Sequence, residues 1–547
     1  MTDVRETAVP DNAPDEVKQR AGVETRAPAT DPTLGVTVKP RPNGKQAPRH
    51  RFVVIGDSLS HGFQSGAVFN TDLSFGAIVA HELGWLDEFR YPRYPGFGGL
   101  PFNIEYVLRE LEDRFGATTN PFELPFAIFK VRNLMNDIEE YWERGPGATP
   151  PNIGAYNHAL AVFSWDLRDA LVRTAASCTA AAANPTNNLL VPMVDNAADR
   201  AALRVYPGWS EEVKQQTLFD VAKTLGDDRG DDRGDDRGDD RDPETQTEGI
   251  ETLVVFLGAN NALGSVVSLQ VKWSQDPGYQ DLATKRNYTV WAPEHFRREF
   301  DLVAAEIEQI NARNVILCTV PHVTIIPVAR GVGTKSTPGS RYFDYYTRPW
   351  ISDADFDPAH DPHVTAAQAR AVDYAIDLYN EHIEAAVKTA RDVGRNWYLL
   401  DIAGILDRLA WRRYINDPSA APPWWSKYPL PPALAALTPE PDTQFLTANG
   451  QGGRRKGGLI SLDGIHPTTV AYGLVAQELI DIMQLAGVEF TSPNGSPRPH
   501  PVTVDFDRLI GRDTLVNAPP QNVNSTLDIV GWLDQTVDVF SQLFLHH

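Results

Sequence analysis

The sequence contains little cysteine and little positive charge. Only Cys178 and Cys318 occur in 547 residues. They are too few for a disulfide framework and lack the spacing of a zinc site, although one bridge between them stays open. The chain has 50 lysines and arginines and 72 aspartates and glutamates, which gives a formal net charge of −22. Because nucleic-acid binders need basic residues to release counterions from phosphates, we expect no nucleic-acid partner, and an anionic membrane surface is disfavoured for the same reason.

Long apolar runs are also missing. No stretch reaches the roughly 18 apolar residues of a membrane helix, so we expect no integral membrane segment. The beginning, MTDVRETAVPDNAP, lacks the basic and apolar regions of a secretory signal, and we therefore expect a cytoplasmic protein. The composition, with 42% apolar and 10% aromatic residues, is typical of a globular chain that can bury a large core. Nothing in it indicates an oligomeric state.

Three regions differ in composition from the rest. Residues 1–49 are rich in proline and acidic residues and almost without aromatics, which predicts a disordered tail. Residues 226–242 repeat Gly-Asp-Asp-Arg four times, and we interpret them as a solvated acidic loop, since arginine in every unit works against calcium binding. Residues 485–547 form an extension that ends in a predicted amphipathic helix with the apolar stripe Ile529, Leu533, Val537, Phe540 and Phe544. The polar face of this helix lacks basic residues before the terminus, which favours docking on the protein's own core or on a sister subunit.

Between residues 50 and 484 the sequence alternates between strand and helix patterns. Continuously apolar runs, as in buried parallel strands, cover residues 52–55, 252–258, 314–320 and 397–401. Helical patterns include one that begins at Pro293, with an apolar stripe formed by Phe296, Phe300, Val303 and Ile307, and one over 367–394. This alternation predicts a doubly wound parallel α/β sheet with its ligand crevice at the carboxyl ends of the strands. Two stretches, about 85–248 and 330–458, break the alternation and are interpreted as insertions that shape the pocket.

A serine follows the first predicted strand, in the run Gly56-Asp57-Ser58-Leu59-Ser60. At the end of a rigid strand its hydroxyl would face the crevice, which suits a nucleophile. The alternative is that Ser58 only caps the next helix. The run lacks the second glycine of the G-x-S-x-G elbow, which disfavours an α/β-hydrolase fold.

A base for this serine is available near the end of the α/β region. Asp463 and His466 are three residues apart, just before a helix that Pro467 opens, so the carboxylate can accept the imidazole N–H and orient the ring. The alternative is a capping aspartate with an incidental histidine. A second cluster of aspartate and histidine, over residues 357–363, has prolines and no helical spacing, which weighs against a metal site.

Asn260 is the candidate donor for an oxyanion. It follows the strand over 252–258, in Gly258-Ala259-Asn260-Asn261, at the same edge of the predicted sheet as Ser58. An amide there can stabilise the negative charge of a tetrahedral intermediate. The alternative for Asn260 is an ordinary turn residue.

Taken together and in order, these three motifs resemble the GDSL or SGNH hydrolase family over residues 50–484. The resemblance implies a flavodoxin-like, three-layer α/β/α fold with a parallel sheet. It also implies that Ser58 is the nucleophile, His466 the base, Asp463 its orienting acid and Asn260 an oxyanion donor. Neither a metal nor an organic cofactor is required by that mechanism.

The chain departs from the family pattern in two places. Asn261 stands where the third block usually has aspartate. The second block normally supplies a glycine N–H to the oxyanion hole, and its best match, NIGAYNHAL, places Asn157 at that glycine. Gly98 or Gly99 is the competing source of this donor.

We therefore expect a serine esterase or lipase that works through an acyl-enzyme. Aromatic segments such as Trp424-Trp425 and YPRYPGF favour a lipid-like or bulky acyl group, unless they only pack within the insertions. The basic run over 454–456 could meet a phospholipid phosphate or be a solvated loop. An acyltransferase, or a non-catalytic binding protein that kept the scaffold, are the alternatives.

Overall fold

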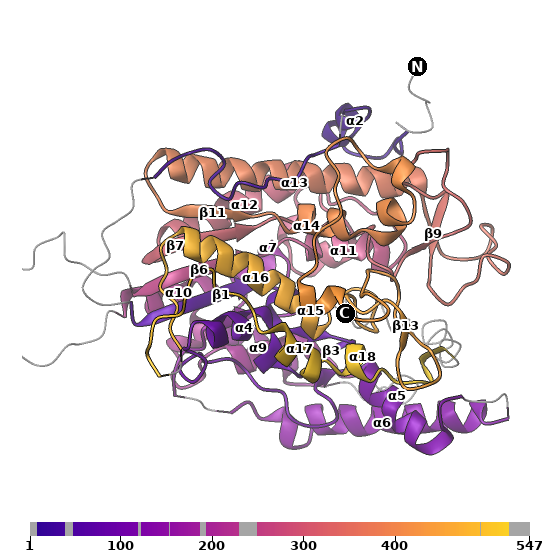
Figure 1. Ribbon diagram of the computed structural model, residues 1–547. Coiled ribbons are helices and arrows are strands. Elements are labelled where there is room, and N and C mark those ends of the chain that lie inside the picture. Colours follow the sequence, from indigo (N-terminus) through magenta and orange to yellow (C-terminus); the bar gives the residue numbers. More distant parts are fainter. Residues whose placement is uncertain are drawn as a thin grey trace, which may run out of the picture.

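The structure is a computed structural model. It describes residues 8–23, 25–38, 48–118, 122–151, 154–185, 193–228, 249–492 and 494–524. A five-stranded sheet lies at the centre, with helices on both faces (Figure 1). Its strands are β1 (His50–Gly56), β5 (Ala159–Ala161), β6 (Ile250–Phe256), β7 (Ala312–Cys318) and β11 (Trp397–Leu400).

All neighbouring strands of this sheet are parallel, in the spatial order β11-β7-β6-β1-β5. Counted along the chain, that order is 2-1-3-4-5, as in flavodoxin-like doubly wound sheets. The connections therefore change direction between β1 and β6. In open α/β sheets the ligand crevice lies beyond the carboxyl ends of the strands at such a switch point. The predicted parallel α/β sheet is thus confirmed.

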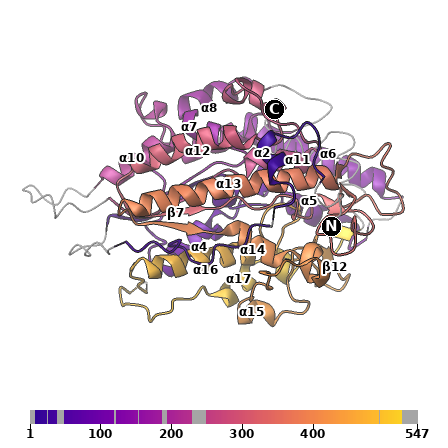
Figure 2. The same ribbon diagram turned by 90° about the horizontal axis from the view of Figure 1, so that it is seen from above.

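Alternate residues of each strand belong to two different cores. Val53 and Ile55 of β1 pack with α10 (Leu218–Asp227), α12 (Pro293–Glu308) and α13 (Ala366–Asp392). Phe52 and Val54 face the opposite way and pack with α4 (Phe75–Glu82), α14 (Ile402–Leu409) and α16 (Thr469–Leu485). Figure 2 shows α12 and α13 on one side of the strands and α4 and α16 on the other. Because both faces are covered, the later residues of β1, β6 and β7 form continuous apolar runs rather than an alternating pattern.

The stretch 85–248 is not wholly an insertion, and the prediction needs correction there. It contains β5 and also α7 (Leu167–Val172) and α10, which belong to the α/β core. β5 has only three residues, too few for a hydrophobic pattern to stand out. The other long helices of this stretch share the same hydrophobic core with the sheet; they are α5 (Ile104–Phe115), α6 (Leu124–Glu143), α8 (Ala175–Ala182) and α9 (Ala197–Val205).

The prediction of a disordered tail over residues 1–49 is wrong for residues 8–23 and 25–38. The helix α2 (Asp15–Arg20) packs against α13, and the side chain of Val17 is fully buried. The composition argument failed because it counted apolar residues in the tail itself. It could not count the surface that the rest of the protein offers to the tail.

Hydrogen bonds and ion pairs also hold this N-terminal segment. The carbonyl oxygen of Pro32 accepts the N–H of Leu399 at 2.9 Å, so the segment covers the edge strand β11. The guanidinium of Arg26 lies 3.0 Å from a carboxylate oxygen of Asp401, directly after that strand. An exposed sheet edge invites pairing with other chains, and the segment removes that possibility along part of β11.

Smaller elements complete the described chain. The short strands are β2 (Phe63–Gln64), β3 (Ala67–Val68), β4 (Leu100–Pro101), β8 (Arg330–Gly331), β9 (Tyr345–Thr347), β10 (Val364–Thr365), β12 (Thr447–Ala448) and β13 (Arg454–Lys456). The remaining helices are α3 (Ser58–His61), α11 (Asn260–Val267), α15 (Pro432–Ala435), α17 (Phe506–Arg512) and α18 (Thr514–Asn517). Among the described helices, none has the length and apolar character needed to cross a membrane. The predicted C-terminal amphipathic helix and most of the acidic repeat lie outside the described residues.

Candidate active site

Ser58 stands where β1 turns into the short helix α3. The preceding Asp57 caps this helix, because its side chain accepts a backbone N–H of the first turn at 3.0 Å. A Cβ at Gly56 would lie 2.8 Å from the carbonyl oxygen of Phe256 on the neighbouring strand. Gly-Asp-Ser therefore has a local reason at each position: close approach of β1 to β6, a helix cap, and a hydroxyl at the end of the strand.

The structure brings Ser58, His466 and Asp463 together. The Nε2 atom of His466 lies 2.9 Å from the Oγ of Ser58, and its Nδ1 lies 2.9 Å from Oδ2 of Asp463. Since a carboxylate can only accept, Nδ1 carries the proton and Nε2 accepts the serine hydroxyl. All three side chains are buried. The geometry is that of a nucleophile, a base and an orienting acid.

Asp463 is held by five hydrogen bonds. One oxygen accepts the backbone N–H groups of Ile465 and His466 and the hydroxyl of Ser461, at 2.8, 2.9 and 3.1 Å. The other accepts the N–H of Gly66 at 3.0 Å in addition to the imidazole. Burial raises the pKa of Asp463, but the charge of His466 and these hydrogen bonds outweigh burial and hold the pKa below its usual value. The carboxylate stays ionised and the imidazole stays oriented.

Asn260 lies at the same edge of the sheet as Ser58. It begins α11, just after β6, and β6 pairs with β1 up to the level of Gly56. One amide hydrogen of Asn260 is donated to the carbonyl oxygen of Trp165 at 2.8 Å. The neighbouring Asn261 accepts the N–H of Leu167 through its side-chain oxygen at 3.4 Å. The two asparagines thus tie the loop after β5 to the end of β6.

The prediction that Asn157 is an oxyanion donor is wrong. β5 pairs with β1 from Val54 and Ala159 onward, so Asn157 precedes the strand and lies at its amino end. Gly56, two residues before Ser58, is already four residues further along the register, about 13 Å away at 3.3 Å per residue. The amide of Asn157 instead donates to two backbone carbonyls of α9 at 3.0 and 2.9 Å.

The loop after β5 offers a different donor. Gly56 pairs with Ala161, so residues 163–165 are level with Ser58. Ser164 adopts a left-handed backbone with φ of 64°, uncommon for a residue other than glycine. Hydrogen bonds engage the N–H groups of its neighbours Val162, Phe163, Trp165, Asp166 and Leu167. Within the described part of the chain, no hydrogen bond engages the N–H of Ser164 itself.

Sequence reasoning missed Ser164 because the second-block pattern was placed on Asn152. If the same six-residue pattern starts at Asn157, it covers β5. Its last position is then Val162, at the beginning of the loop that contains Ser164. The alternatives Gly98 and Gly99 do not line the pocket described below. The N–H of Gly99 is bonded to the carbonyl oxygen of Gly96 at 2.9 Å.

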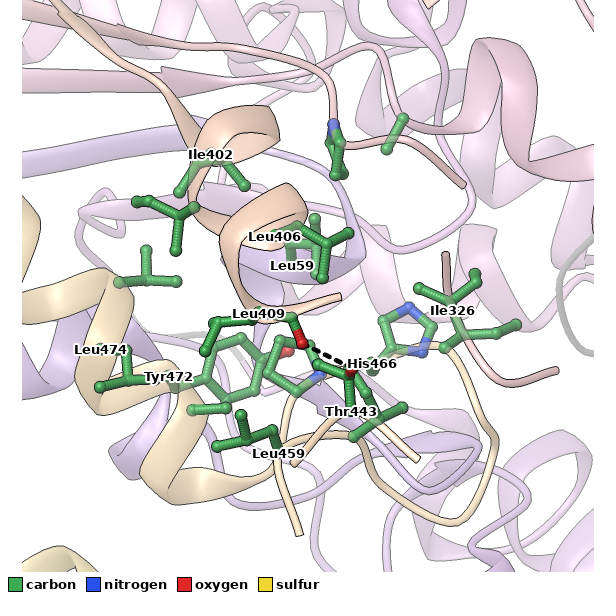
Figure 3. A pocket seen from close by; sticks show the side chains of 18 of the residues that line it. Leu59, Ile326, Ile402, Leu406, Leu409, Thr443, Leu459, His466, Tyr472 and Leu474 are labelled. Carbon is green, nitrogen blue, oxygen red and sulfur yellow. Dashed lines mark hydrogen bonds between the residues drawn. The ribbon is translucent and has the colours of Figure 1, made fainter. Parts of the chain in front are cut away.

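Ser58 and His466 open onto an apolar pocket with a cavity volume of about 120 Å³. Figure 3 shows side chains of α14 and α16 around the pocket, with His466 at one end. The apolar lining comprises Leu59, Phe75, Phe256, Leu263, Val323, Ile326, Ile402, Ile405, Leu406, Leu409, Leu459, Ile460, Ile465, Tyr472, Leu474 and Val475. Such a lining can exclude water from the apolar part of a ligand and offers that ligand few hydrogen-bond partners.

The aromatic residues expected to shape the pocket are used elsewhere. Trp425 packs against Tyr414 with ring centroids 5.7 Å apart, and its indole N–H donates to the carbonyl oxygen of Asp407 at 3.0 Å. Trp424 donates to the hydroxyl of Thr25 in the N-terminal segment at 3.1 Å. Neither tryptophan lines the pocket. Packing explains this pair, and the apolar pocket comes from α14 and α16.

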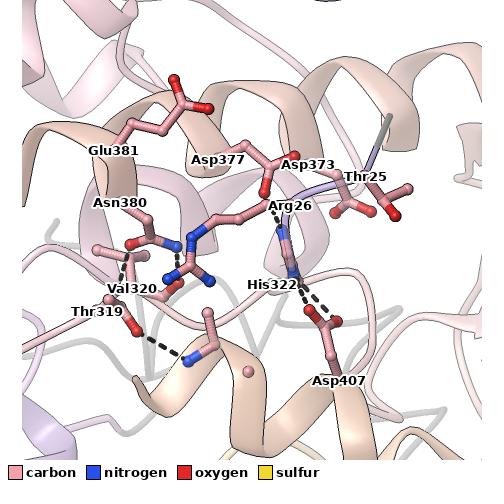
Figure 4. A network of polar contacts seen from close by, with 12 residues as sticks. Thr25, Arg26, Thr319, Val320, His322, Asp373, Asp377, Asn380, Glu381 and Asp407 are labelled. Carbon is pink, nitrogen blue, oxygen red and sulfur yellow. Dashed lines mark hydrogen bonds and ion pairs between the residues drawn. The ribbon is translucent and has the colours of Figure 1, made fainter. Parts of the chain in front are cut away.

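A second buried histidine, His322, lines the same pocket. Its Nδ1 lies 3.1 Å from both carboxylate oxygens of Asp407, and its Nε2 lies 3.2 Å from Oδ1 of Asp377 (Figure 4). Burial lowers the pKa of His322, but the two carboxylates outweigh it and raise the pKa to about 10. His322 is therefore a buried imidazolium at neutral pH. No sequence pattern indicated this histidine, because its partners Asp377 and Asp407 lie 55 and 85 residues away.

The polar network around His322 fixes the segment that follows β7. The side chain of Asn380 on α13 donates to the carbonyl oxygen of Val320 at 2.9 Å and accepts its N–H at 2.7 Å. The hydroxyl of Thr319 donates to Asp401 at 2.8 Å. These bonds hold the end of β7 and the pocket wall in one position (Figure 4).

Three further features of the sequence have structural explanations. Asp357 and His360 form a local pair at 2.6 Å, and no group of three or more possible ligands could hold a metal ion in the described part of the chain. Arg454 is buried and donates to the carbonyl oxygen of Pro439 at 2.7 Å, while the next two basic residues are exposed. Cys178 and Cys318 are free thiols, and they lie in the cores on opposite faces of the sheet.

Compared with known protein families and with curated proteins, the chain matches none.

Proposed function

We propose that the chain is a serine hydrolase of the SGNH type that cleaves carboxylic esters through an acyl-enzyme. Ser58 is the nucleophile, His466 the general base and Asp463 the acid that orients the imidazole. The observation that carries this proposal is the pair of 2.9 Å contacts at the two nitrogens of His466. The position of Ser58 at the switch point between β1 and β6 adds support, because ligands of doubly wound sheets bind there.

In the first half of the reaction, Ser58 Oγ attacks the ester carbonyl while Nε2 of His466 takes the hydroxyl proton. The carbonyl oxygen becomes an oxyanion that accepts hydrogen bonds from the N–H of Ser58, the N–H of Ser164 and the second amide hydrogen of Asn260. Collapse of the intermediate breaks the ester C–O bond. His466 returns its proton to the leaving alcohol, and the acyl group remains on Ser58.

In the second half, a water molecule takes the place of the alcohol. His466 removes a proton from this water, which attacks the acyl carbonyl, and the same donors stabilise the second oxyanion. The bond from Ser58 to the acyl carbon breaks, and Oγ regains the proton from His466. The products are a carboxylic acid and the free enzyme. With an acceptor alcohol in place of water, the same steps would form a new ester.

The acyl group of the substrate is a long, unbranched apolar chain that lies between α14 and α16. The apolar lining of the pocket supports this substrate class, since each methylene moved from water into such a wall contributes about 0.8 kcal/mol. The few polar groups at the pocket belong to Ser58, His466, His322 and Thr443, and the hydroxyl of Thr443 donates to the carbonyl oxygen of Leu409 at 2.8 Å. Selection among esters therefore acts mainly through chain length.

The test of the nucleophile is labelling with a fluorophosphonate probe that reacts with activated serines. Wild-type protein is expected to be labelled at Ser58 and to hydrolyse nitrophenyl esters, and Ser58→Ala is expected to lose both properties. The matched control is Ser60→Ala, which should retain both properties. It removes a buried hydroxyl two residues from Ser58 that has no hydrogen-bond partner among the described residues. Labelling and turnover that survive in Ser58→Ala would refute the mechanism.

The test of the acyl site is a chain-length series of nitrophenyl esters from acetate to palmitate. Leu406→Trp on α14 narrows the pocket, so kcat/KM for the longest esters is expected to fall at least about tenfold relative to butyrate, because several methylenes lose their contacts. Leu485→Trp serves as the control, because Leu485 on α16 is exposed and outside the pocket. An equal loss for short and long chains would contradict the assignment.

A further inference from the structure

The helix α6 carries an aromatic stripe on its outer surface. Phe126 and Phe129 of α6 are 67% and 64% exposed, and their spacing of three residues puts them on one side of the helix. Phe122 lies in the turn two residues before the helix begins and is 88% exposed. The opposite side of α6 is buried, through Ala127, Val131, Leu134, Met135, Ile138 and Trp142. A single exposed apolar side chain is ordinary, but three adjacent phenylalanines indicate an interaction site.

The stripe lies on a helical hairpin that begins at the catalytic loop. The N–H of Ile104, the first residue of α5, is bonded to the carbonyl oxygen of Ser65 at 2.8 Å. The next residue, Gly66, donates to Asp463 of the triad. From this root α5 extends for 12 residues, about 18 Å, and α6 packs against it. The two helices form the lower edge of the molecule in Figure 1.

The size of the stripe favours insertion into a lipid surface over a protein interface. Three phenylalanine side chains can bury about 450 to 750 Å², whereas a stable protein interface needs about 800 Å² from each partner. Beyond Phe129 the same side of α6 becomes polar, with Arg132, Asn133 and Asp137 exposed. The apolar area is therefore confined to one end of the helix, which suits shallow insertion of that end.

The charges around the stripe indicate which lipid surface it fits. Glu123 and Arg132 are of opposite sign, and Lys130 is paired with Glu110 at 3.0 Å, so no basic cluster accompanies the phenylalanines. The whole chain carries a net charge of −22. An anionic membrane would repel such a protein, whereas a zwitterionic or uncharged surface exerts no such repulsion.

We infer that the aromatic stripe of Phe122, Phe126 and Phe129 docks this protein on a zwitterionic or uncharged lipid surface. Docking holds the protein at a surface that contains long-chain esters, the substrate class of the proposed function. That role rests on the proposed function, whereas the docking itself rests on the exposed stripe.

Flotation with phosphatidylcholine vesicles tests the docking apart from catalysis. It uses the full chain with Ser58→Ala, so that no lipid is hydrolysed. Replacing all three phenylalanines of the stripe by serine is expected to lower the fraction bound per lipid at least about 30-fold, since each loses its transfer into the apolar phase. The matched control replaces Leu302, Val393 and Leu485 by serine; these are 49%, 71% and 58% exposed but scattered, and binding should not change.

Four results would overturn the inference. Binding that survives the three serine substitutions would exclude the stripe, and binding only to anionic vesicles would exclude the surface chemistry. A shift from dimer to monomer in the serine variant, without vesicle binding by the parent, would assign the stripe to a second copy of this chain. A gain of vesicle binding after Leu533→Ser and Phe540→Ser would assign it to the C-terminal segment.

A second measurement uses protein in which Ser58 is intact. It compares the rate of hydrolysis of a vesicle-borne ester with that of a soluble short-chain ester. The ratio of the two rates is expected to fall about 30-fold in the serine variant of the stripe and to stay constant in the scattered control. If the protein binds vesicles through the stripe but hydrolyses neither ester, docking stands and the proposed function fails. If the protein hydrolyses both esters but its vesicle binding does not depend on the stripe, the proposed function stands and the docking inference fails.

Discussion

Two buried histidines, His466 and His322, line the same pocket. They differ in the group that contacts the Nε2 atom of the imidazole. The Nδ1 of His466 bonds to Asp463 and its Nε2 faces the hydroxyl of Ser58. Both nitrogens of His322 bond to carboxylates, those of Asp407 and Asp377. An imidazole with a hydroxyl at Nε2 can take a proton from it, whereas one between two carboxylates stays protonated.

The difference shows that a histidine and an aspartate in contact do not by themselves make a catalytic base. His466 is three residues from its carboxylate in sequence and stands at the carboxyl edge of the sheet, beside the serine. His322 lies at the same edge, but its charge is used to compensate buried carboxylates of α13 and α14. One pair is arranged for proton transfer and the other for holding the pocket wall.

His466→Ala separates the two roles most strongly. Without the base, kcat is expected to fall on the order of 10⁵- to 10⁶-fold, as when one member of a catalytic triad is lost. Stability should change by only about 1 to 2 kcal/mol, because Asp463 keeps its four other hydrogen bonds. Ester hydrolysis and urea unfolding measure the two quantities. Activity within tenfold of wild type would remove His466 from the mechanism.

His322→Ala should show the opposite pattern. Removing the imidazolium leaves Asp377 and Asp407 buried without their counter-charge, which costs about 3 to 5 kcal/mol of the unfolding free energy. At a temperature where the variant is folded, hydrolysis of a short ester is expected to continue. Asp357→Ala provides the control, since Asp357 forms its pair with His360 at an exposed site. A loss of activity as large as that of His466→Ala, with unchanged stability, would contradict the comparison.

Asn260→Ala tests the proposed role of the Asn260 amide as a hydrogen-bond donor to the oxyanion. Loss of one oxyanion donor is expected to lower kcat about 10² to 10³-fold with little change in KM. Asn260→Asp is the sharper variant, because it keeps the size of the side chain and removes its amide hydrogens. It should be at least as impaired. If either variant raised KM alone, Asn260 would be a binding residue rather than an oxyanion donor.

Asp57 extends the comparison to a buried carboxyl that no imidazole accompanies. Burial raises the pKa of Asp57 to about 7, despite hydrogen bonds from backbone N–H groups. Between its usual pKa and 7 the folded state keeps a proton that the unfolded state has released, so stability falls as pH rises through this window. Asp57→Asn should flatten this decline and raise stability at pH 8 by on the order of 2 kcal/mol. Urea unfolding at pH 5 to 8 measures the free energy of unfolding, and Asp113→Asn at an exposed site is the control. If the pH dependence of this free energy is the same in Asp57→Asn as in the wild type, the raised pKa is contradicted.

The central fold could be predicted because its signals are local. The apolar runs that became β1, β6, β7 and β11 are continuous in sequence, and the helix from Pro293 shows its buried stripe directly. β5 could not be found, since three residues carry no period, and its role as the edge strand depends on pairing with β1. The N-terminal segment was misjudged for a related reason: its partners Leu399 and Asp401 are far away in the chain.

The sequence alone determined which candidate groups stand at the ends of the elements: a serine after an apolar strand, an aspartate and a histidine three residues apart, and an asparagine after another strand. Those are side-chain identities at the ends of elements, and local physical chemistry places them. Only the tertiary structure decided that Nε2 of His466 meets Ser58 across 408 positions, that Ser164 rather than Asn157 is level with the nucleophile, and that His322 is not a base. Strand register and burial decided these, because both depend on contacts between segments distant in the chain.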